Sequence, residues 1–267
     1  MLIPPSQMQT MSTRELYLFD TMGLLRIPGF LSPDAVEVCR DEVRRLSSTE
    51  ALGDGEKEKV EDLVGNSAHF AELAADEAVR ALVEPLINQP YRLIESYALR
   101  RTRQSVFYLH NGSGEVLRYG GDRVARRNMS YMHTFHDGKL YCMFVKVLIY
   151  LSDVLRDDDG PFCYLQGSHK ANFAWFPDGD SGSPNAWVSE TGNPRVALTR
   201  ENFPSLEFVR AKAGDALVIN EALLHGSLQK ASGGERILTA LGFAPSFVTD
   251  WKRLDPRSND IQRLGHY

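Results

Sequence analysis

The sequence predicts an α+β fold that is mainly β, in which helices pack on one side of an antiparallel barrel or sandwich. Helical patterns are confined to the chain before Tyr91, and strand-like segments follow it. Glycine and proline punctuate the strand-like part, as in the loop DDDGPF (157–162). Helices first and strands afterwards are typical of α+β domains whose helices gather on one face of the sheet.

The length and composition of the chain indicate one domain. Its 267 residues suit a single large domain, and 43% of them are hydrophobic, which is enough for a sizeable core. We expect one domain over 1–267, with a mainly helical part over 13–90 and a barrel core over 91–250. A net charge of −5 argues against a nucleic-acid polymer or a membrane surface as the partner.

Three cysteines, Cys39, Cys142 and Cys163, form no CxxC pair. A sparse and odd number of cysteines is typical of reduced thiols, and all three are expected to be buried as small apolar residues. The first residues show no basic segment followed by an apolar one, so a signal peptide is not expected. Together these features predict a cytoplasmic protein.

Two helices are predicted in the N-terminal part, after about a dozen frayed residues. The first is FLSPDAVEVCRDEVRRL (30–46), where Ser32 can cap the helix and Pro33 suits its first position. A charged linker broken by glycines, LGDGEKEKVED (52–62), follows it. The second helix is AHFAELAADEAVRALVEPLI (68–87), whose apolar residues recur at helical spacing.

Strand signals dominate the rest of the chain. They lie in YALRRTRQSVFYL (97–109), KLYCMFVKVLIYL (139–151), ALVIN (216–220) and RILTALGF (236–243). The dipeptide Asp137-Gly138 predicts a tight hairpin turn before the second of these segments. Residues 174–195 are long and polar for a connection, so they are either a lid over a site or a solvated surface insertion.

Three late segments carry candidate functional residues: GPFCYLQGSHK (160–170), AGDALVINEALLHGS (213–227) and GGERILTALGF (233–243). His225 follows a strand, and Arg236 opens another strand eleven residues later. A single histidine or arginine is more often structural or solvated than functional. In order and spacing, however, these segments and YLFDTMGLLRIPGFLSPDAVEVCRDEVRRL (17–46) resemble the phytanoyl-CoA dioxygenase branch of the iron(II)/2-oxoglutarate oxygenases.

The resemblance implies a double-stranded β-helix, which is a jelly-roll or cupin-like barrel, with the N-terminal helices packed on one face. It also implies Fe(II), 2-oxoglutarate and O2 as cofactors, with His225 as an iron ligand. Ser227 and Arg236 would bind the far carboxylate of 2-oxoglutarate, because a guanidinium forms two parallel hydrogen bonds with a carboxylate. Lys146, on an otherwise apolar strand, either reaches the same carboxylate or extends to solvent.

The second iron-binding histidine is harder to assign, because the sequence has no His-x-Asp or His-x-Glu motif. His110, in His110-Asn111-Gly112, is the favoured candidate, since relatives with a His-Gly-Gly motif resemble this segment. The alternative pairs His133 with Asp137, although Asp137 fits the predicted hairpin turn better than a ligand position.

A glycine at the usual carboxylate position resembles the halogenases of this superfamily. Gly112, beside Asn111, would leave room for chloride, which replaces both the ligand and its negative charge. The implied reaction is chlorination of an unactivated carbon by hydrogen abstraction and chlorine transfer, which depends on the position of the target carbon. A hydroxylase using Asp137 and a metal-free module that binds small anions stay as alternatives, and Asn-Gly is also a common turn.

Arginines near His110 suggest an anionic substrate, because guanidinium groups bind phosphates and carboxylates. The candidate substrate-binding residues are Arg101, Arg103, Arg126, Arg127 and, in the segment 174–195, Trp175. A solvated loop is the commoner explanation of such a cluster. If it is functional, the substrate is a small metabolite such as an adenine nucleotide, as in nucleoside-antibiotic biosynthesis. A substrate tethered to a carrier protein is the alternative.

Overall fold

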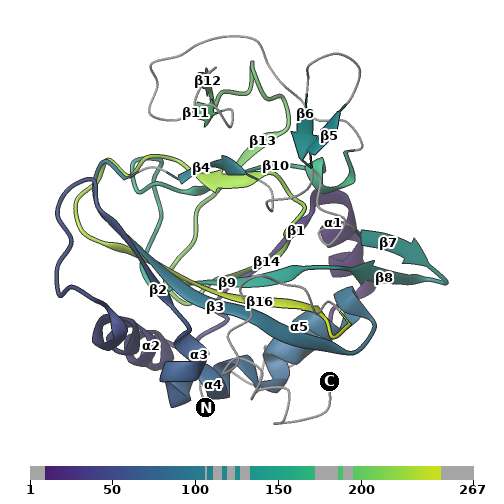
Figure 1. Cartoon of the computed structure of the whole chain (residues 1–267), viewed down its shortest axis with the longest axis horizontal. Helices are drawn as coiled ribbons and strands as arrows, with labels where there is room; N and C mark the ends of the chain where they lie inside the picture. The colour runs from purple at the N-terminus through teal and green to yellow at the C-terminus, as the bar shows by residue number, and fades with distance from the viewer. Residues whose placement is uncertain are drawn as a thin grey trace.

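Two facing sheets form a barrel, with helices beneath one of them (Figure 1). The computed structural model describes residues 10–105, 107–110, 116–118, 124–126, 133–171, 186–188 and 195–247. In this part of the chain the larger sheet has the order β1 (Leu24–Ile27), β14 (Ala216–Asn220), β9 (Val145–Tyr150), β16 (Arg236–Pro245), β3 (Tyr91–Arg101) and β2 (Lys57–Glu61). All of its strand pairs are antiparallel.

The smaller sheet lies across the lumen from the larger one and has the order β13 (Leu206–Val209), β10 (Phe162–Leu165), β15 (His225–Ser227) and β4 (Phe107–His110). Three separate hairpins are β5 (Val116–Arg118) with β6 (Val124–Arg126), β7 (His133–His136) with β8 (Lys139–Cys142), and β11 (Ala186–Val188) with β12 (Arg195–Ala197). Two antiparallel sheets that face each other in this way are a jelly-roll barrel, which confirms the predicted fold class.

The helices are α1 (Thr13–Met22), α2 (Pro33–Leu46), α3 (Leu63–Asn66), α4 (Ala68–Ala74), α5 (Glu77–Ile87) and a short 3-10 helix, η3 (Ser168–Lys170). Helices α2 to α5 cover the outer face of the larger sheet (Figure 1). Their apolar residues, such as Phe70 and Val83, form one core with Val145, Val147 and Ile149 of β9. No helix in the described ranges is long and apolar enough to cross a membrane.

Residues of the larger sheet alternate between this core and the lumen of the barrel. On β9, Leu148 and Tyr150 belong to a second cluster, which is built with Phe162 and Tyr164 of the smaller sheet. The two-residue period of a strand therefore directs Lys146, which has the same parity, toward the lumen.

Local sequence signals explain where two of the helices begin. Helix α2 starts as predicted, with the Ser32 side chain accepting a hydrogen bond from the Ala35 amide at 3.2 Å. The sequence analysis missed α1, although Ser12 and Glu15 form a capping box at its start.

Two further predictions about the elements were wrong, and the prediction of a lid or a surface insertion over 174–195 is not tested. The single helix expected over 68–87 is two helices, because Asp76 accepts a hydrogen bond from Ala78 and starts α5. The expected linker 52–62 contains β2, which pairs with β3 at the sheet edge. The polar segment 174–195 contains β11, while 174–185 and 189–194 lie outside the described residues.

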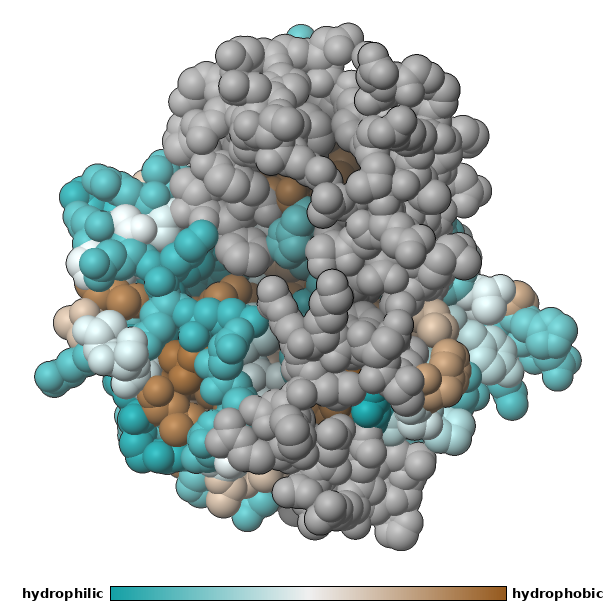
Figure 2. Space-filling view, in the orientation of Figure 1, coloured by the Kyte–Doolittle hydropathy of each residue, from teal (hydrophilic) through white to brown (hydrophobic). Residues whose placement is uncertain are grey.

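The described surface mixes polar and apolar residues. Figure 2 shows mostly hydrophilic colour on this face, with separate hydrophobic areas between. The large apolar residues that are most exposed are spread over the chain, and they are Tyr17, Phe135, Leu155 and Phe247. Such single exposed residues are normal for a folded domain. All three cysteines are free and buried, as expected.

Candidate active site

Two histidines meet across the smaller sheet. His225, the first residue of β15, pairs in register with His110, the last residue of β4. Their ring centroids are 4.5 Å apart, with an angle of 52° between the rings. His225 is buried, and Phe162 of β10 stacks on its other side at 5.4 Å. We call His110 and His225 the histidine pair.

The hydrogen bonding of His225 suits a metal ligand. Its Nδ1 lies 2.7 Å from the carbonyl oxygen of Leu223. Because a carbonyl only accepts, Nδ1 carries the proton and Nε2 keeps the lone pair. Burial, and next the neighbouring His110, hold the pKa of His225 well below its usual value. A neutral imidazole fixed by a backbone acceptor is the usual arrangement of a metal-binding histidine.

Two buried arginines lie side by side on the larger sheet. Arg236 of β16 pairs in register with Arg101 of β3, and each is 2% exposed. One guanidinium nitrogen of Arg236, Nη1, donates to the Gly160 carbonyl at 2.7 Å, whereas Nε and Nη2 have no hydrogen-bond partner among the described residues. Nη2 of Arg101 donates to the carbonyls of Ser105 and Leu228, and its Nη1 has no described partner.

These arginines line a small cavity together with Ser227, Leu99 and Leu238. We call Arg101, Arg236 and Ser227 the arginine end of the lumen. Burial, and next the charge of Arg236, lower the pKa of Arg101 to about 9. Buried guanidinium donors without partners are costly, so the cavity favours an anion with several acceptor oxygens. A carboxylate meets that requirement, which makes the arginine end suitable for 2-oxoglutarate.

A second polar group lies at the other end of the larger sheet. Lys146 of β9 forms ion pairs with Glu221 at 2.7 Å and with Glu95 of β3 at 2.8 Å. Burial alone would lower the pKa of Lys146, but Glu221, Tyr97 and Glu95 raise it well above its usual value. We call Glu95, Lys146 and Glu221 the glutamate end. Lys146 is therefore paired with carboxylates of this chain, and its predicted contact with 2-oxoglutarate stays a prediction.

The glutamates were missed by the sequence analysis, although one signal for Glu95 was available. Glu95, Tyr97, Leu99 and Arg101 alternate along β3, so they share the lumen face of that strand. Glu221 follows the end of β14, and only the three-dimensional structure brings it to Lys146.

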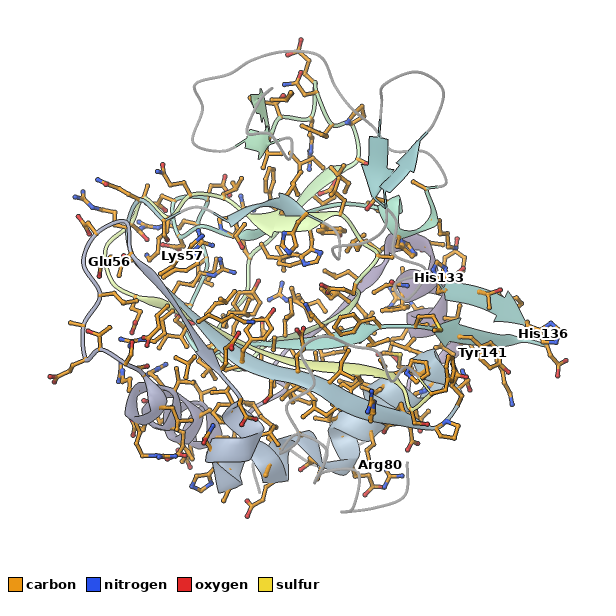
Figure 3. All side chains as sticks on the ribbon, in the orientation of Figure 1. Glu56, Lys57, Arg80, His133, His136 and Tyr141 are labelled. Atoms are coloured by element: carbon orange, nitrogen blue, oxygen red, sulfur yellow. The ribbon has the colours of Figure 1, made fainter. Side chains whose placement is uncertain are left out.

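His133 and Asp137 occupy the hairpin of β7 and β8, which belongs to neither barrel sheet. The ring of His133 stacks on His169 at 5.0 Å, and its Nε2 lies 3.9 Å from a carboxylate oxygen of Asp20. Figure 3 shows His133 at the base of this hairpin and His136 at its far end. Asp137 and Gly138 both have positive φ, 51° and 72°, which confirms the predicted tight turn. Asp137 is an exposed turn residue four positions from His133.

Of the arginines expected to bind the substrate, Arg101 and Arg103 have described side chains, and these two lie in different surroundings. Arg101 belongs to the arginine end, whereas Arg103 is exposed and pairs with Asp54 at 2.7 Å. Arg100 is buried between Glu58 and Glu235, at 2.7 and 2.6 Å. The side chain of Arg126 and the residues Arg127, Trp175, Asn111 and Gly112 lie outside the described part of the chain.

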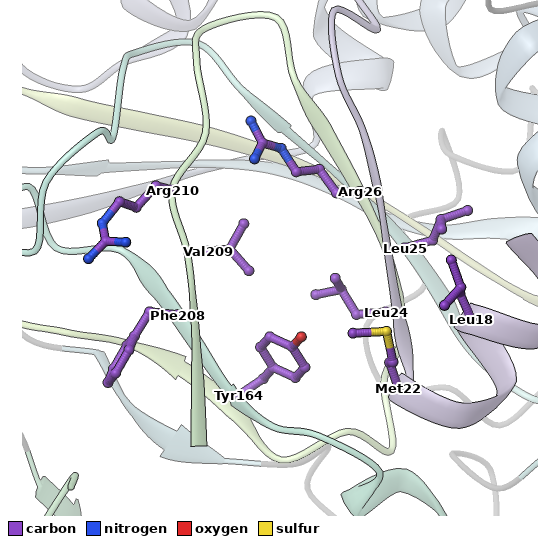
Figure 4. A pocket seen from close by; sticks show the side chains of 9 residues that line it. All are labelled: Leu18, Met22, Leu24, Leu25, Arg26, Tyr164, Phe208, Val209 and Arg210. Carbon is purple, nitrogen blue, oxygen red and sulfur yellow. The ribbon is translucent and has the colours of Figure 1, made fainter. Parts of the chain in front are cut away.

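A larger pocket, of about 330 Å³, lies elsewhere, between α1, β1 and the smaller sheet (Figure 4). It is lined by Leu18, Met22, Leu24, Leu25, Arg26, Tyr164, Phe208, Val209 and Arg210. None of these residues belongs to the histidine pair or to either end of the lumen. We therefore place the active site in the lumen and not in this larger pocket.

Comparison with known proteins agrees with this geometry. The family model for phytanoyl-CoA dioxygenase matches residues 19–238. HygX from Streptomyces hygroscopicus, in a crystal structure with nickel, 2-oxoglutarate and hygromycin B bound, is 43% identical, with a TM-score of 0.75. That match covers 91% of this chain and 90% of HygX. HygX with iron bound is 42% identical, with a TM-score of 0.74 and coverage of 91% and 90%.

The chain therefore belongs to the phytanoyl-CoA dioxygenase family, and it is an enzyme of the iron(II)/2-oxoglutarate-dependent oxygenase type. The predicted family is confirmed, and HygX was crystallised with iron bound and with nickel and 2-oxoglutarate bound. The epimerase SnoN from nogalamycin biosynthesis shares the fold at 19% identity, with a TM-score of 0.58 and coverage of 91% and 85%. Comparison with curated proteins gives no match.

Proposed function

We propose that the lumen is the active site of an enzyme that oxidises a C–H bond of a small substrate rich in hydroxyl and amino groups. In this proposal His110 and His225 bind iron(II), while Arg236, Ser227 and Arg101 bind the far carboxylate of 2-oxoglutarate. The single observation that carries it is the arginine end. Two buried guanidinium groups there leave three N–H-bearing nitrogens without a described partner, on the sheet that faces the histidine pair.

Each protein group has a defined task in this proposal. The Leu223 carbonyl accepts a hydrogen bond from Nδ1 and fixes the His225 ring, which leaves Nε2 as the nitrogen that would bind the metal. Arg236 and Arg101 hold an anion in a cavity lined by apolar Leu99 and Leu238, which strengthens the attraction between opposite charges. Iron(II), 2-oxoglutarate and O2, when bound, supply the oxidising power for the C–H bond.

Two observations support a substrate with amino groups. HygX was crystallised with hygromycin B, an aminoglycoside, and it is 43% identical to this chain. In addition, the lumen holds the carboxylates of Glu95 and Glu221. The described arginines give an anionic nucleotide less support, since Arg100 and Arg103 are paired with carboxylates and Arg101 lies beside Arg236, while Arg127 and the side chain of Arg126 lie outside the described residues.

Chlorination is a second candidate outcome, and one observation favours it. Gly112 stands two positions after His110, where the family resemblance implies a carboxylate, and a glycine has no side chain that could bind the iron in place of chloride. Among the described residues, no group of three or more His, Cys, Asp or Glu side chains suits a metal ion. Hydroxylation and chlorination share the abstraction step and differ in the atom that the substrate carbon receives.

Anaerobic optical titration tests the proposal. Iron(II) and 2-oxoglutarate are added to wild-type protein, with and without chloride, and the visible charge-transfer band of the complex is recorded. We expect a band in wild type and in His133→Ala, and no band in His110→Ala or His225→Ala. A band that survives in His110→Ala and disappears in His133→Ala would show that the second ligand is wrongly assigned.

Turnover then decides between the two outcomes. Air is admitted with hygromycin B as the probe substrate, and products are identified by mass spectrometry. Gain of oxygen or loss of two hydrogens supports oxidation, whereas a product with the chlorine isotope pattern supports halogenation. Wild-type protein that gives no band with iron(II) and 2-oxoglutarate would overturn the proposed function altogether.

A further inference from the structure

We propose that the glutamate end of the lumen is a recognition subsite for an ammonium group of the substrate. Glu221 and Glu95 supply the acceptor oxygens, and Lys146 holds the two carboxylates in position. The inference rests on the proposed function, because it concerns the substrate of the same lumen. It identifies the charge that the substrate carries and the residues that select it.

The subsite lies in a row across the larger sheet. Gly242 of β16 pairs with Lys146 of β9 on one side and with Glu95 of β3 on the other. Gly242 and Arg236 are six residues apart on β16, so the glutamate and arginine ends are about 20 Å apart along that strand. Their equal parity directs both toward the lumen.

The glutamate end contains two carboxylates and one ammonium group, so its negative charge is not fully neutralised. Glu95 and Glu221 share Lys146, which leaves one net negative charge in a group whose side chains are 15%, 4% and 8% exposed, respectively. Lys59, which lies over the Tyr97 ring at 4.4 Å, is already paired with Glu61 at 2.8 Å. A buried excess carboxylate is unfavourable unless a cation or a hydrogen-bond donor completes it.

Acceptor capacity remains at the glutamate end, most clearly on Glu221. Oε2 of Glu221 is buried and has no hydrogen-bond partner among the described residues. Oε1 of Glu95 lies 2.8 Å from the Lys146 nitrogen but receives no hydrogen bond with acceptable geometry. An ionised carboxylate accepts about four hydrogen bonds, so the pair can receive several more donors. A substrate ammonium group, with three N–H donors, supplies both the charge and the donors.

Aromatic rings complete the cation-binding character of this end. The Lys146 nitrogen lies 5.0 Å from the centroid of Phe144 and 5.7 Å from that of Tyr97. Ring faces at such distances attract cations, and the attraction increases when water is excluded. The combination of carboxylates and ring faces thus suits an ammonium group better than a phosphate.

Gly242 provides the space in which Glu95 meets Lys146. A Cβ atom at Gly242 would lie 2.6 Å from Cγ of Glu95 and 2.8 Å from Cε2 of Phe144. No side chain fits there, so Glu95 passes over β16 to reach Lys146 on the next strand. Only glycine at this position leaves enough space for the Glu95 side chain to cross β16.

A buried triad elsewhere in the chain shows what a purely structural arrangement looks like. Arg100 is held between Glu58 and Glu235, at 2.7 and 2.6 Å. The other oxygen of Glu58 accepts hydrogen bonds from the amide and hydroxyl of Ser48. Neither Glu58 nor Glu235 keeps a buried oxygen without a partner among the described residues. The triad in the lumen therefore differs in its unused acceptor capacity, not only in its position.

Calorimetric titration of the anaerobic enzyme, loaded with iron(II) and 2-oxoglutarate, tests the subsite. The probes are hygromycin B and N-acetylated hygromycin B, which has lost its positive charges. We expect Glu221→Gln and Glu95→Gln to weaken hygromycin B binding about 10- to 100-fold, as for loss of charge-assisted hydrogen bonds. Glu58→Gln is the matched control, and it should bind like wild type. Wild type should bind the acetylated probe more weakly by a similar factor.

Several results would overturn the inference. The first is that wild type binds the two probes with equal affinity. The second is that both lumen variants bind hygromycin B as tightly as wild type. The third is that wild type forms the charge-transfer band but does not bind hygromycin B. The comparison of probes uses wild type alone, so it stands even if a variant fails to fold. Absence of the band in wild type contradicts the proposed function instead, and titration of the metal-free protein with the two probes then tests the subsite separately.

Discussion

At the arginine end of the lumen, two buried guanidinium groups lie side by side and form no salt bridge within the described residues. At the glutamate end, on the same sheet, two buried carboxylates share one lysine. At the arginine end the positive charges are left for a ligand. At the glutamate end Lys146 neutralises one of the two negative charges within the protein. The two ends therefore differ in how folding stability and ligand binding depend on each side chain.

This difference has a physical reason. A buried charge without a partner costs free energy in the folded state, and the cost is recovered when a ligand of opposite charge binds. Removing such a charge weakens binding with little loss of stability. Removing the cation from a buried ion triad leaves two carboxylates uncompensated, so stability falls sharply. Substitutions at the two ends should separate these effects.

The largest expected effect is that of Lys146→Met. The substitution leaves Glu95 and Glu221 buried without their shared cation, so the free energy of unfolding should fall by about 3–5 kcal/mol. Urea denaturation at pH 7 measures the change. Lys170→Met removes an exposed pair with Asp20 and should cost less than about 1 kcal/mol. If the two lysine variants are equally stable, the glutamate end is not a buried ion triad.

The dependence of folding stability on pH should reveal a buried histidine, His169, that lies beside α1 and belongs to neither end of the lumen. Burial, and next the neighbouring His133, lower the pKa of His169 to about 4, from 6.5 in the unfolded chain. Between these values the unfolded chain binds a proton that the folded chain does not, so acid favours unfolding. The contribution of His169 to stability, which is complete above pH 6.5, should fall by about 3 kcal/mol as the pH drops to about 4.

Denaturation curves measured between pH 7 and pH 4 give this dependence. The matched variant is His169→Gln, whose amide can still donate to the carbonyl oxygen of Asp20 that lies 3.0 Å from Nε2 of His169. Its unfolding free energy should depend less on pH than that of wild type. The same pH slope in both proteins would show that His169 does not cause the acid sensitivity.

The smallest expected change in stability is that of Arg101→Met. Loss of its hydrogen bonds to the Ser105 and Leu228 carbonyls is offset by removal of a buried charge and its repulsion from Arg236. The free energy of unfolding should change by less than about 1 kcal/mol, while 2-oxoglutarate binding weakens about 10-fold. The exposed control Arg103→Met should alter neither. A large loss of stability with unchanged 2-oxoglutarate binding would make Arg101 a structural residue.

The sequence predicted the parts of the fold that depend on local patterns. The strand signals along 139–151, the cap at Ser32 and the Asp137-Gly138 turn are set by neighbouring residues, and all three are present. His225, Ser227 and Arg236 are close in sequence, and it was their resemblance to a known family, not their spacing alone, that suggested a site. The break at Asp76 was missed because apolar residues on both sides keep the helical period.

Other features depend on strand pairing, which a linear pattern does not contain. His110 meets His225, and Arg101 meets Arg236, only through the registers of distant strands. The ion pairs of Lys146 depend on the space at Gly242, between two other strands. Lys146 and Arg101 were both selected from the sequence as residues of interest, but the side chains that they meet in the barrel were not.

The central claim is that the two ends of the lumen bind oppositely charged ligands. It is tested by the affinities of 2-oxoglutarate and hygromycin B in Arg236→Gln and Glu221→Gln, measured by anaerobic calorimetry with iron(II) bound. We expect each variant to lose a different ligand. Arg236→Gln should bind 2-oxoglutarate about 30-fold more weakly, and Glu221→Gln should bind hygromycin B about 30-fold more weakly. Each variant should retain its other ligand. Equal loss of both ligands in either variant would contradict the division of the lumen into two ends.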